Sequence, residues 1–147
     1  MSTEVDAFLS ETMPRLNEAE IALHNGDAGP RTAMWSHNDP VTLFGAAALN
    51  GNGWGEIGPI FEQLGALLSN CTAYQNEVVA AGASGDLAYL VALEHTSASV
   101  KGAPPQPYVL RVTSVFRREG GEWKVVHRHG DPASDSAVAL AKQIAST

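Results

Sequence analysis

Residues 108–131 read YVLRVTSVFRREGGEWKVVHRHGD, and they combine the clearest local structure of the chain with its densest polar chemistry. β-Branched and aromatic residues fill both arms of this stretch, and Gly120 and Gly121 between the arms tolerate the positive φ that a hairpin turn requires. The stretch therefore predicts two antiparallel strands, residues 108–118 and 123–130, joined by a tight turn.

Side chains alternate between the two faces of a strand, so the hairpin also predicts which residues share a face. One face would carry Val109, Arg111, Thr113 and Val115 from the first arm and Trp123, Val125, His127, His129 and Asp131 from the second. Apolar residues mixed with a few polar groups are typical of the wall of a small-molecule cavity. The alternative is an exposed or dimer-facing sheet surface, and periodicity alone does not separate the two.

Helical spacing of apolar residues dominates the first half of the chain, over residues 3–25, 30–36 and 54–68. Pro14 lies inside the first of these segments, where proline removes a backbone donor. We therefore expect a short leading helix, and then a main helix that Thr12 caps and that holds Pro14 in its first turn.

The second half of the chain shows the period of two that strands have. After a short strand over residues 41–45 and a loop over residues 50–53, four strands are expected at residues 72–81, 86–100, 108–118 and 123–130, with a loop at 101–107. Helices followed by an antiparallel meander predict one α+β domain over residues 1–147, ending in a tail helix at residues 134–145.

Composition excludes several classes of function. The formal net charge is −7, whereas nucleic acids and anionic membranes require a basic surface. Cys71 is the only cysteine, so neither an internal disulfide nor a cysteine-based metal cage is expected. The acidic start MSTEVDAF lacks the pattern of a secretory leader, and no apolar run approaches the ~18 residues that span a bilayer. We expect a cytoplasmic protein.

Several segments resemble the nuclear transport factor 2-like superfamily, in its SnoaL-like and ketosteroid isomerase-like branch. They are Asn25-Gly26-Asp27, residues 38–45, Gly53-Trp54, residues 85–89 and residues 113–129. The last of them also resembles the closing hairpin of the association domain of calcium/calmodulin-dependent protein kinase II. The resemblance covers residues 5–131. It implies an α+β cone, in which a curved sheet wraps long helices and opens at one end into a cavity, and a homodimer through the outer face of the sheet.

Isomerases and cyclases that this chain resembles use a carboxylate or imidazole to move a proton next to a carbonyl, and a donor to hold the oxygen. Asp39 lies about where the general base of ketosteroid isomerase lies; the alternative is a turn carboxylate ahead of Pro40. The tyrosine donor of that family comes from the first helix, but the first tyrosine here is Tyr74. His24 or His37 could partly substitute for it.

His129 and Asp39 are our predicted catalytic pair, and Arg111 is predicted to hold an oxygen of the substrate. Arg111 would need a partner inside a cavity, either Asp39, Glu94 or a ligand carboxylate. Glu94 and His95 are adjacent in a strand, so only one of them can face the cavity. Two histidines and a carboxylate could also form a metal triad, but the resemblance favours a site without metal or other cofactor.

The remaining predicted substrate-binding residues are Thr113, His127, Trp35, Phe44, Trp54 and Tyr74, and the alternative for the aromatic ones is a place in the core. Our first hypothesis is a protein that binds a small, largely apolar, carbonyl-bearing compound, either as an isomerase, cyclase or hydratase or without catalysis. The alternative is a non-catalytic module that binds a ligand or forms a dimer. Whether the protein is an enzyme is left open by the residues.

Overall fold

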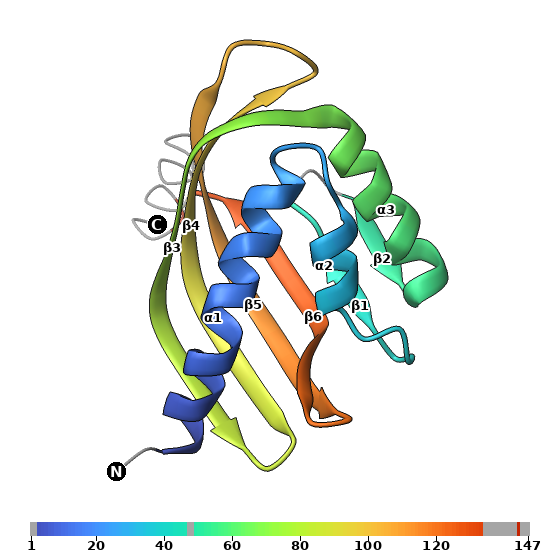
Figure 1. The fold of residues 1–147 in the computed structure, drawn as a ribbon, viewed down its shortest axis with the longest axis vertical. Helices are drawn as coiled ribbons and strands as arrows, with labels where there is room; N and C mark the ends of the chain where they lie inside the picture. Colours follow the sequence, from blue (N-terminus) through green and yellow to red (C-terminus); the bar gives the residue numbers. More distant parts are fainter. Residues whose placement is uncertain (1–2, 47–48, 134–143, 145–147) are drawn as a thin grey trace.

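The computed structural model describes residues 3–46, 49–133 and 144. Three helices pack on the concave side of one curved sheet, and α1 crosses that face from the N-terminus upward in Figure 1. This arrangement confirms the predicted α+β class. In chain order the elements are α1 (Glu4–Leu23), α2 (Gly29–Met34), β1 (Thr42–Phe44), β2 (Asn50–Asn52), α3 (Trp54–Leu67), β3 (Leu68–Ser84), β4 (Leu87–Val100), β5 (Gln106–Glu119) and β6 (Glu122–Pro132).

The six strands follow the order β2-β1-β6-β5-β4-β3. The meander β3–β6 is antiparallel as predicted, and β1 joins β6 in parallel, with Thr42 opposite His127. The predicted loop at residues 50–53 is wrong for its first three residues, because they form the edge strand β2. A Cβ atom at Gly51 would lie 2.7 Å from Cγ1 of Ile57, so glycine lets α3 pack directly on this strand.

Helix α1 is continuous, so the predicted break before Pro14 is wrong. Thr3 caps the helix and forms a capping box with Asp6, whereas Thr12 is fully buried within the helix. Pro14 lies on the exposed side and leaves one helical carbonyl without its donor. Phe8 and Leu16, on either side of Pro14, both bury their side chains, and this packing holds the two halves of the helix in line.

Aromatic side chains fill the core beside the first half of α1. The Phe8 ring meets Phe116 and Trp123 edge-on, with ring centroids 5.0 and 5.2 Å apart. Trp35 and Phe61 make a similar contact at 5.2 Å further along the sheet. The aromatic rings do not extend to Leu23 at the other end of α1, where the structure has a cavity.

Most other predicted boundaries differ from the structure by a few residues. The 101–107 loop is shorter than predicted, because Gln106 and Pro107 already belong to β5. The tail helix predicted over residues 134–145 lies outside the described residues apart from Ile144. In the described part of the chain no helix is both long and apolar enough to cross a bilayer.

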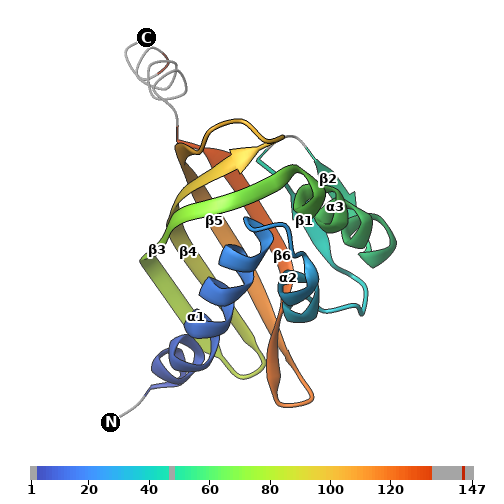
Figure 2. The same ribbon diagram turned by 45° about the horizontal axis from the view of Figure 1, so that its top comes forward.

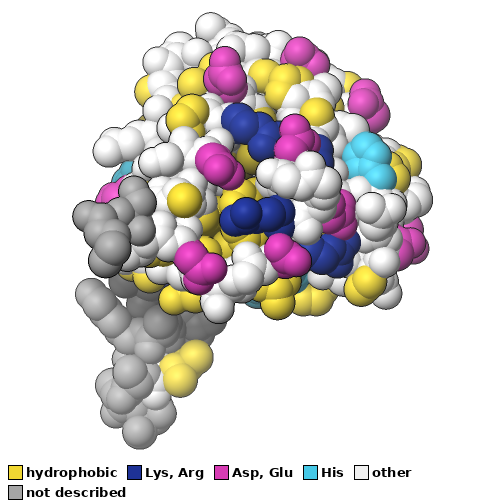
Figure 3. Space-filling model, turned by 60° about the horizontal axis from the view of Figure 1, so that its bottom comes forward, with side chains coloured by type: hydrophobic (Ala, Val, Ile, Leu, Met, Phe, Trp, Pro, Cys, Tyr) yellow, Lys and Arg dark blue, Asp and Glu magenta, His cyan; other side chains and the backbone are white. Residues whose placement is uncertain are grey.

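Basic and acidic side chains alternate at the end of the molecule shown in Figure 3. At the β5–β6 hairpin, Arg117 pairs with Glu119 at 2.6 Å and Lys124 with Glu122 at 3.1 Å. The guanidinium of Arg118 lies over the Trp123 ring, 4.4 Å from its centroid. The basic residues of this end are therefore engaged locally and do not form the large basic patch that nucleic acids bind.

A β-bulge in β6 decides which of its side chains face the helices. Val115 pairs with His127 and Phe116 with Val125, so Val126 is an extra residue on β6. A bulge places two residues opposite one and shifts the alternation of the strand by one position. Strict alternation predicted from the sequence therefore cannot hold on both sides of Val126.

The predicted mixed inward face is consequently wrong beyond the bulge. Trp123 and Val125 are buried inside the cone as predicted, but Arg128 is the inward residue after the bulge and is only 8% exposed. His127 and His129 instead lie on the outer face of the sheet, where the Phe44 ring contacts both.

On β5 the predicted face is the outer one. The buried residues are Val112, Ser114 and Phe116, whereas Arg111 and Thr113 are exposed. The outer face of β5 carries valines as well as Arg111 and Thr113, so its composition resembles that of a cavity wall. The alternative of an exposed sheet surface is thus the correct one for Arg111 and Thr113.

Candidate functional site

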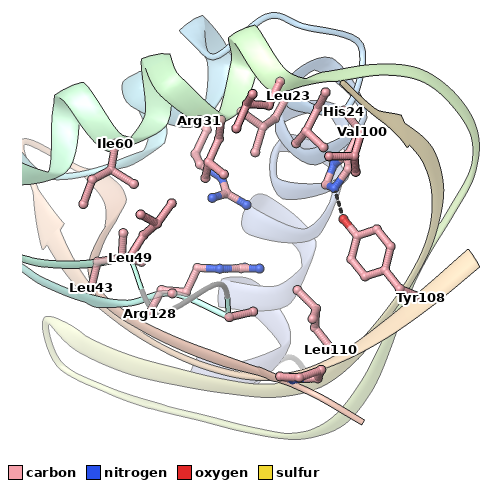
Figure 4. Close-up of a pocket in the computed structure, with 16 residues that line it drawn as sticks. Leu23, His24, Arg31, Leu43, Leu49, Ile60, Val100, Tyr108, Leu110 and Arg128 are labelled. Carbon is pink, nitrogen blue, oxygen red and sulfur yellow. Dashed lines mark hydrogen bonds between the residues drawn. The ribbon is translucent and has the colours of Figure 1, made fainter. Parts of the chain in front are cut away.

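A cavity of about 350 Å³ opens between the end of α1, helix α3 and the sheet, where β1, β4, β5 and β6 contribute to its wall. Its size lies within the usual range for small-molecule sites. Figure 4 shows side chains from helices and strands converging on it. Its wall is mainly aliphatic, with Leu23, Leu43, Leu49, Ile60, Leu64, Leu67, Leu68, Val100 and Leu110.

Four polar side chains interrupt this aliphatic wall, namely His24, Arg31, Tyr108 and Arg128. They come from four different elements or their ends: the C-cap of α1, α2, β5 and β6. Figure 4 shows both guanidinium groups directed towards the middle of the cavity and the His24 ring facing Tyr108. Sequence reasoning included only His24 among the candidates.

The tautomer of His24 follows from its two partners. Nδ1 lies 2.7 Å from the backbone oxygen of Glu20, which can only accept, so Nδ1 carries the proton. Nε2 is then an acceptor, and the Tyr108 hydroxyl donates to it. The second tyrosine nearby is Tyr74, whose ring centroid lies 6.5 Å from that of His24.

Burial keeps this pair neutral near pH 7. It lowers the pKa of His24 below 6.5, against the opposing charge of Glu20. Burial also raises the pKa of Tyr108 to about 12, and it raises the pKa of Tyr74 further still. The site therefore presents a neutral imidazole acceptor and a neutral phenol donor side by side.

Two buried ion pairs stand next to the His24–Tyr108 pair. Arg31 donates from Nε and Nη2 to the two oxygens of Glu20. Arg128 donates from Nη1 and Nη2 to the two oxygens of Glu94, and each of these two bonds is 2.8 Å long. Arg128 also lies 3.9 Å from Glu20, which links the pairs. Both carboxylates are 1% exposed. Paired in this way, the four charges sum to zero and each group is hydrogen-bonded.

Glu20 is ionised in this network. Burial alone would raise the pKa of Glu20, but the charges of Arg31 and Arg128 outweigh it and lower the pKa to about 2. Glu94 is the residue of the Glu94–His95 pair that faces inward. His95 lies outside, where its Nε2 is 3.0 Å from Oε1 of Glu77.

Arg111, predicted to hold a substrate oxygen, pairs with Asp131 and not with Asp39, Glu94 or a ligand carboxylate, its predicted partners. Its Nε and Nη2 donate to both oxygens of Asp131 at 2.8 and 2.7 Å. With Thr113 and His129, this pair borders an open hollow of about 410 Å³ on the outer face. His127 lies on the same face, and its Nδ1 is 2.8 Å from Oγ1 of Thr42; burial lowers its pKa.

Asp39 does not line the cavity either. Its Oδ1 accepts a hydrogen bond of 3.0 Å from the backbone N–H of Trp54, so its carboxylate stands at the start of α3. The Trp54 ring stacks on His37, with centroids 3.9 Å apart. The structure thus does not bring Asp39 and His129 together in the cavity, and their catalytic roles remain predictions.

The aromatic residues predicted to bind substrate are spread over the molecule. Trp35 is buried in the core, Phe44 is half exposed on the outer face, and Trp54 packs between His37 and Phe61. Tyr74 alone approaches the polar end of the cavity, where its hydroxyl accepts a 3.3 Å hydrogen bond from Asn76.

Sequence reasoning missed Tyr108, Arg31 and Arg128. One signal for Tyr108 was present in the sequence, because the even-numbered residues 108–116 of β5 carry no charge. The face of a strand that lacks charged side chains is the one expected to be buried. Arg128 depends on the bulge at Val126, which has no comparable signal. In the described residues no cluster of three or more His, Cys, Asp or Glu side chains could hold a metal ion.

A model of the SnoaL-like domain matches residues 15–134. Similar solved structures include a Streptomyces avermitilis protein of the NTF2-like family that is proposed to be a dehydratase, with a TM-score of 0.69, 20% identity, and coverage of 88% of this chain and 98% of that chain. The S. rosetta CaMKII hub has a TM-score of 0.65, 23% identity, and coverage of 90% and 99%.

An NTF2-like protein of unknown function from Rhodospirillum rubrum has a TM-score of 0.64, 19% identity, and coverage of 86% and 98%. Among curated proteins, none matches the chain. At these identities the likeness establishes the fold, and it confirms the predicted NTF2-like α+β cone.

Proposed function

The chain belongs to the SnoaL-like domain family, and from that premise we propose that it binds a small, largely apolar, carbonyl-bearing compound in the cavity at the end of α1. The observation that carries this proposal is the neutral His24–Tyr108 pair on a mainly aliphatic wall, whose two arginines are already paired with glutamates. Apolar walls supply affinity for such a ligand, and a few convergent polar groups orient it.

The same pair supports proton transfer within the bound compound. A carbonyl oxygen beside Tyr108 would accept the phenolic hydrogen bond, which stabilises the oxygen as it gains negative charge. Nε2 of His24 would then be free to accept a proton from the carbon next to the carbonyl. Return of that proton at another carbon completes an isomerisation, and transfer of the proton to a departing hydroxyl group completes a dehydration.

We would test this proposal with a panel of small aromatic and alicyclic ketones, measuring binding by amide chemical shifts of isotopically labelled protein. Binders are expected to shift the amides of Leu23, Val100 and Leu110, and Tyr108→Phe is expected to weaken them. The matched control is Tyr89→Phe, which removes an exposed hydroxyl on the outer sheet face and should leave binding unchanged. Shifts confined to the outer face would contradict the proposal.

A second function has its own support, namely assembly through the outer sheet face. That face is free of the three helices in Figures 1 and 2, and it exposes Val79 by 60%, Leu87 by 58% and Tyr89 by 47%. Exposed apolar clusters of this kind commonly mark protein interfaces. The hub relatives share the fold.

We propose that the occupant of this face is a second copy of the chain. Sedimentation over a range of concentrations should then give a dimer, and Val79→Lys should shift it towards monomer. A protein that remains monomeric at every concentration would rule out this assembly.

A further inference from the structure

We propose that the cavity selects uncharged ligands over carboxylates, and that Glu20 and Glu94 are the residues that set this selectivity. The inference rests on the proposed function, since it concerns what the same cavity accepts. Two arginines in a cavity wall would ordinarily indicate an anionic ligand, so this selectivity is the opposite of what the residue types alone suggest.

One two-nitrogen edge of each arginine is already occupied by a glutamate. Arg31 presents Nε and Nη2 to Glu20, and Arg128 presents Nη1 and Nη2 to Glu94. Each is a two-nitrogen edge of the kind that a ligand carboxylate would need for bidentate binding. A guanidinium has five N–H donors, so three remain on each arginine for a ligand oxygen, but the edge that faces its glutamate is closed to a ligand carboxylate.

The charge balance of the cavity gives an independent argument. The two carboxylates and two guanidinium groups sum to zero and are almost fully buried. Of the other titratable groups of the wall, His24 and Tyr108 are neutral near pH 7, and so is Tyr74 beside His24. A ligand carboxylate would therefore bring an uncompensated negative charge into an aliphatic site, which is unfavourable, whereas a ketone would not.

This balance predicts how selectivity can be changed. Glu94→Gln removes one negative charge and keeps a side chain of similar shape. Arg128 would then carry an uncompensated positive charge at the cavity, and a ligand carboxylate could replace the missing partner. Glu20→Gln makes the same change at Arg31 and serves as the second variant.

The experiment compares probes that share a ring and differ only in charge, namely acetophenone with benzoate and acetylnaphthalene with naphthoate. Dissociation constants come from calorimetry, and amide shifts of Leu23, Val100 and Leu110 locate the probe in the cavity. For the wild type we expect each ketone to bind at least about tenfold more tightly than its carboxylate. Glu94→Gln should reduce or reverse this ratio.

The matched control is Glu77→Gln, which removes a carboxylate that pairs with His95 on the outer face; it should keep the wild-type ratio. A carboxylate that binds the wild type as tightly as its ketone would overturn the selectivity while leaving the cavity as a ligand site. An unchanged ratio in folded Glu94→Gln and Glu20→Gln would overturn the role of the two glutamates. If neither ring pair binds in the cavity, the proposed function fails and this inference fails with it.

Discussion

Tyr108 in β5 donates a hydrogen bond to Nε2 of His24 at the end of α1, although 84 residues separate them in the chain. The bond ties the helix end to the sheet across the cavity. Tyr108→Phe removes the hydroxyl and leaves the ring, so we expect a loss of about 1 kcal/mol in the free energy of unfolding, typical of one neutral hydrogen bond. Urea unfolding measures it, and an unchanged stability would show that the bond contributes nothing in solution.

His24 should also make stability depend on pH. Its pKa is lowered below 6.5 by burial, so below about pH 6.5 the unfolded chain binds more protons than the folded one. Stability is therefore lost as the pH falls from about 6.5 through the lowered pKa of the folded state. We expect His24→Gln to flatten this part of the curve in urea unfolding at a series of pH values. A slope identical to that of the wild type would contradict the assignment.

Arg128 and Glu94 are buried as a pair, and removal of one partner should be costly. Arg128→Met leaves a buried carboxylate uncompensated, which we expect to cost about 3–5 kcal/mol. The double variant with Glu94→Leu removes both charges and should recover most of that loss. A double-mutant cycle by chemical denaturation measures the coupling.

The Arg111–Asp131 pair provides a control that is also bidentate but lies in an exposed place. Its side chains are 62% and 43% exposed, against 10% and 2% for Arg128 and Glu94. Arg111→Met should therefore cost no more than about 1 kcal/mol. Equal losses at Arg111 and Arg128 would show that burial does not decide the strength of these pairs.

The order of the elements could be predicted because it depends on local periodicity, which the β5–β6 hairpin and the apolar spacing of α1 and α3 display. The break at Pro14 was wrong because packing of Phe8 and Leu16 outweighs one missing hydrogen bond. β2 was missed because asparagine and glycine have low strand propensity. The strand is stabilised by its close packing against α3 at Gly51, and such a contact cannot be inferred from propensity.

The site was harder to predict than the fold. One extra residue, Val126, reverses the faces of β6, so Arg128 is inside and His129 is outside. The His24–Tyr108 contact and the two ion pairs join segments far apart in the chain, and their residue types occur elsewhere in the sequence on the surface. Only the three-dimensional arrangement distinguishes Arg128, bound to Glu94, from Arg111, bound to Asp131.

Asp39 allows its predicted catalytic role to be separated from its structural one. Its carboxylate accepts from the Trp54 N–H at the start of α3, so Asp39→Ala should cost about 1 kcal/mol, as for other helix caps. Asp39→Asn keeps an oxygen that can accept this hydrogen bond but cannot act as a base. We therefore expect Asp39→Asn to retain most of the stability in urea unfolding. Because Asp39 does not line the cavity, we also expect this variant to turn over any ketone substrate of the cavity at the wild-type rate. A stable Asp39→Asn variant that loses turnover would instead restore Asp39 as the catalytic base.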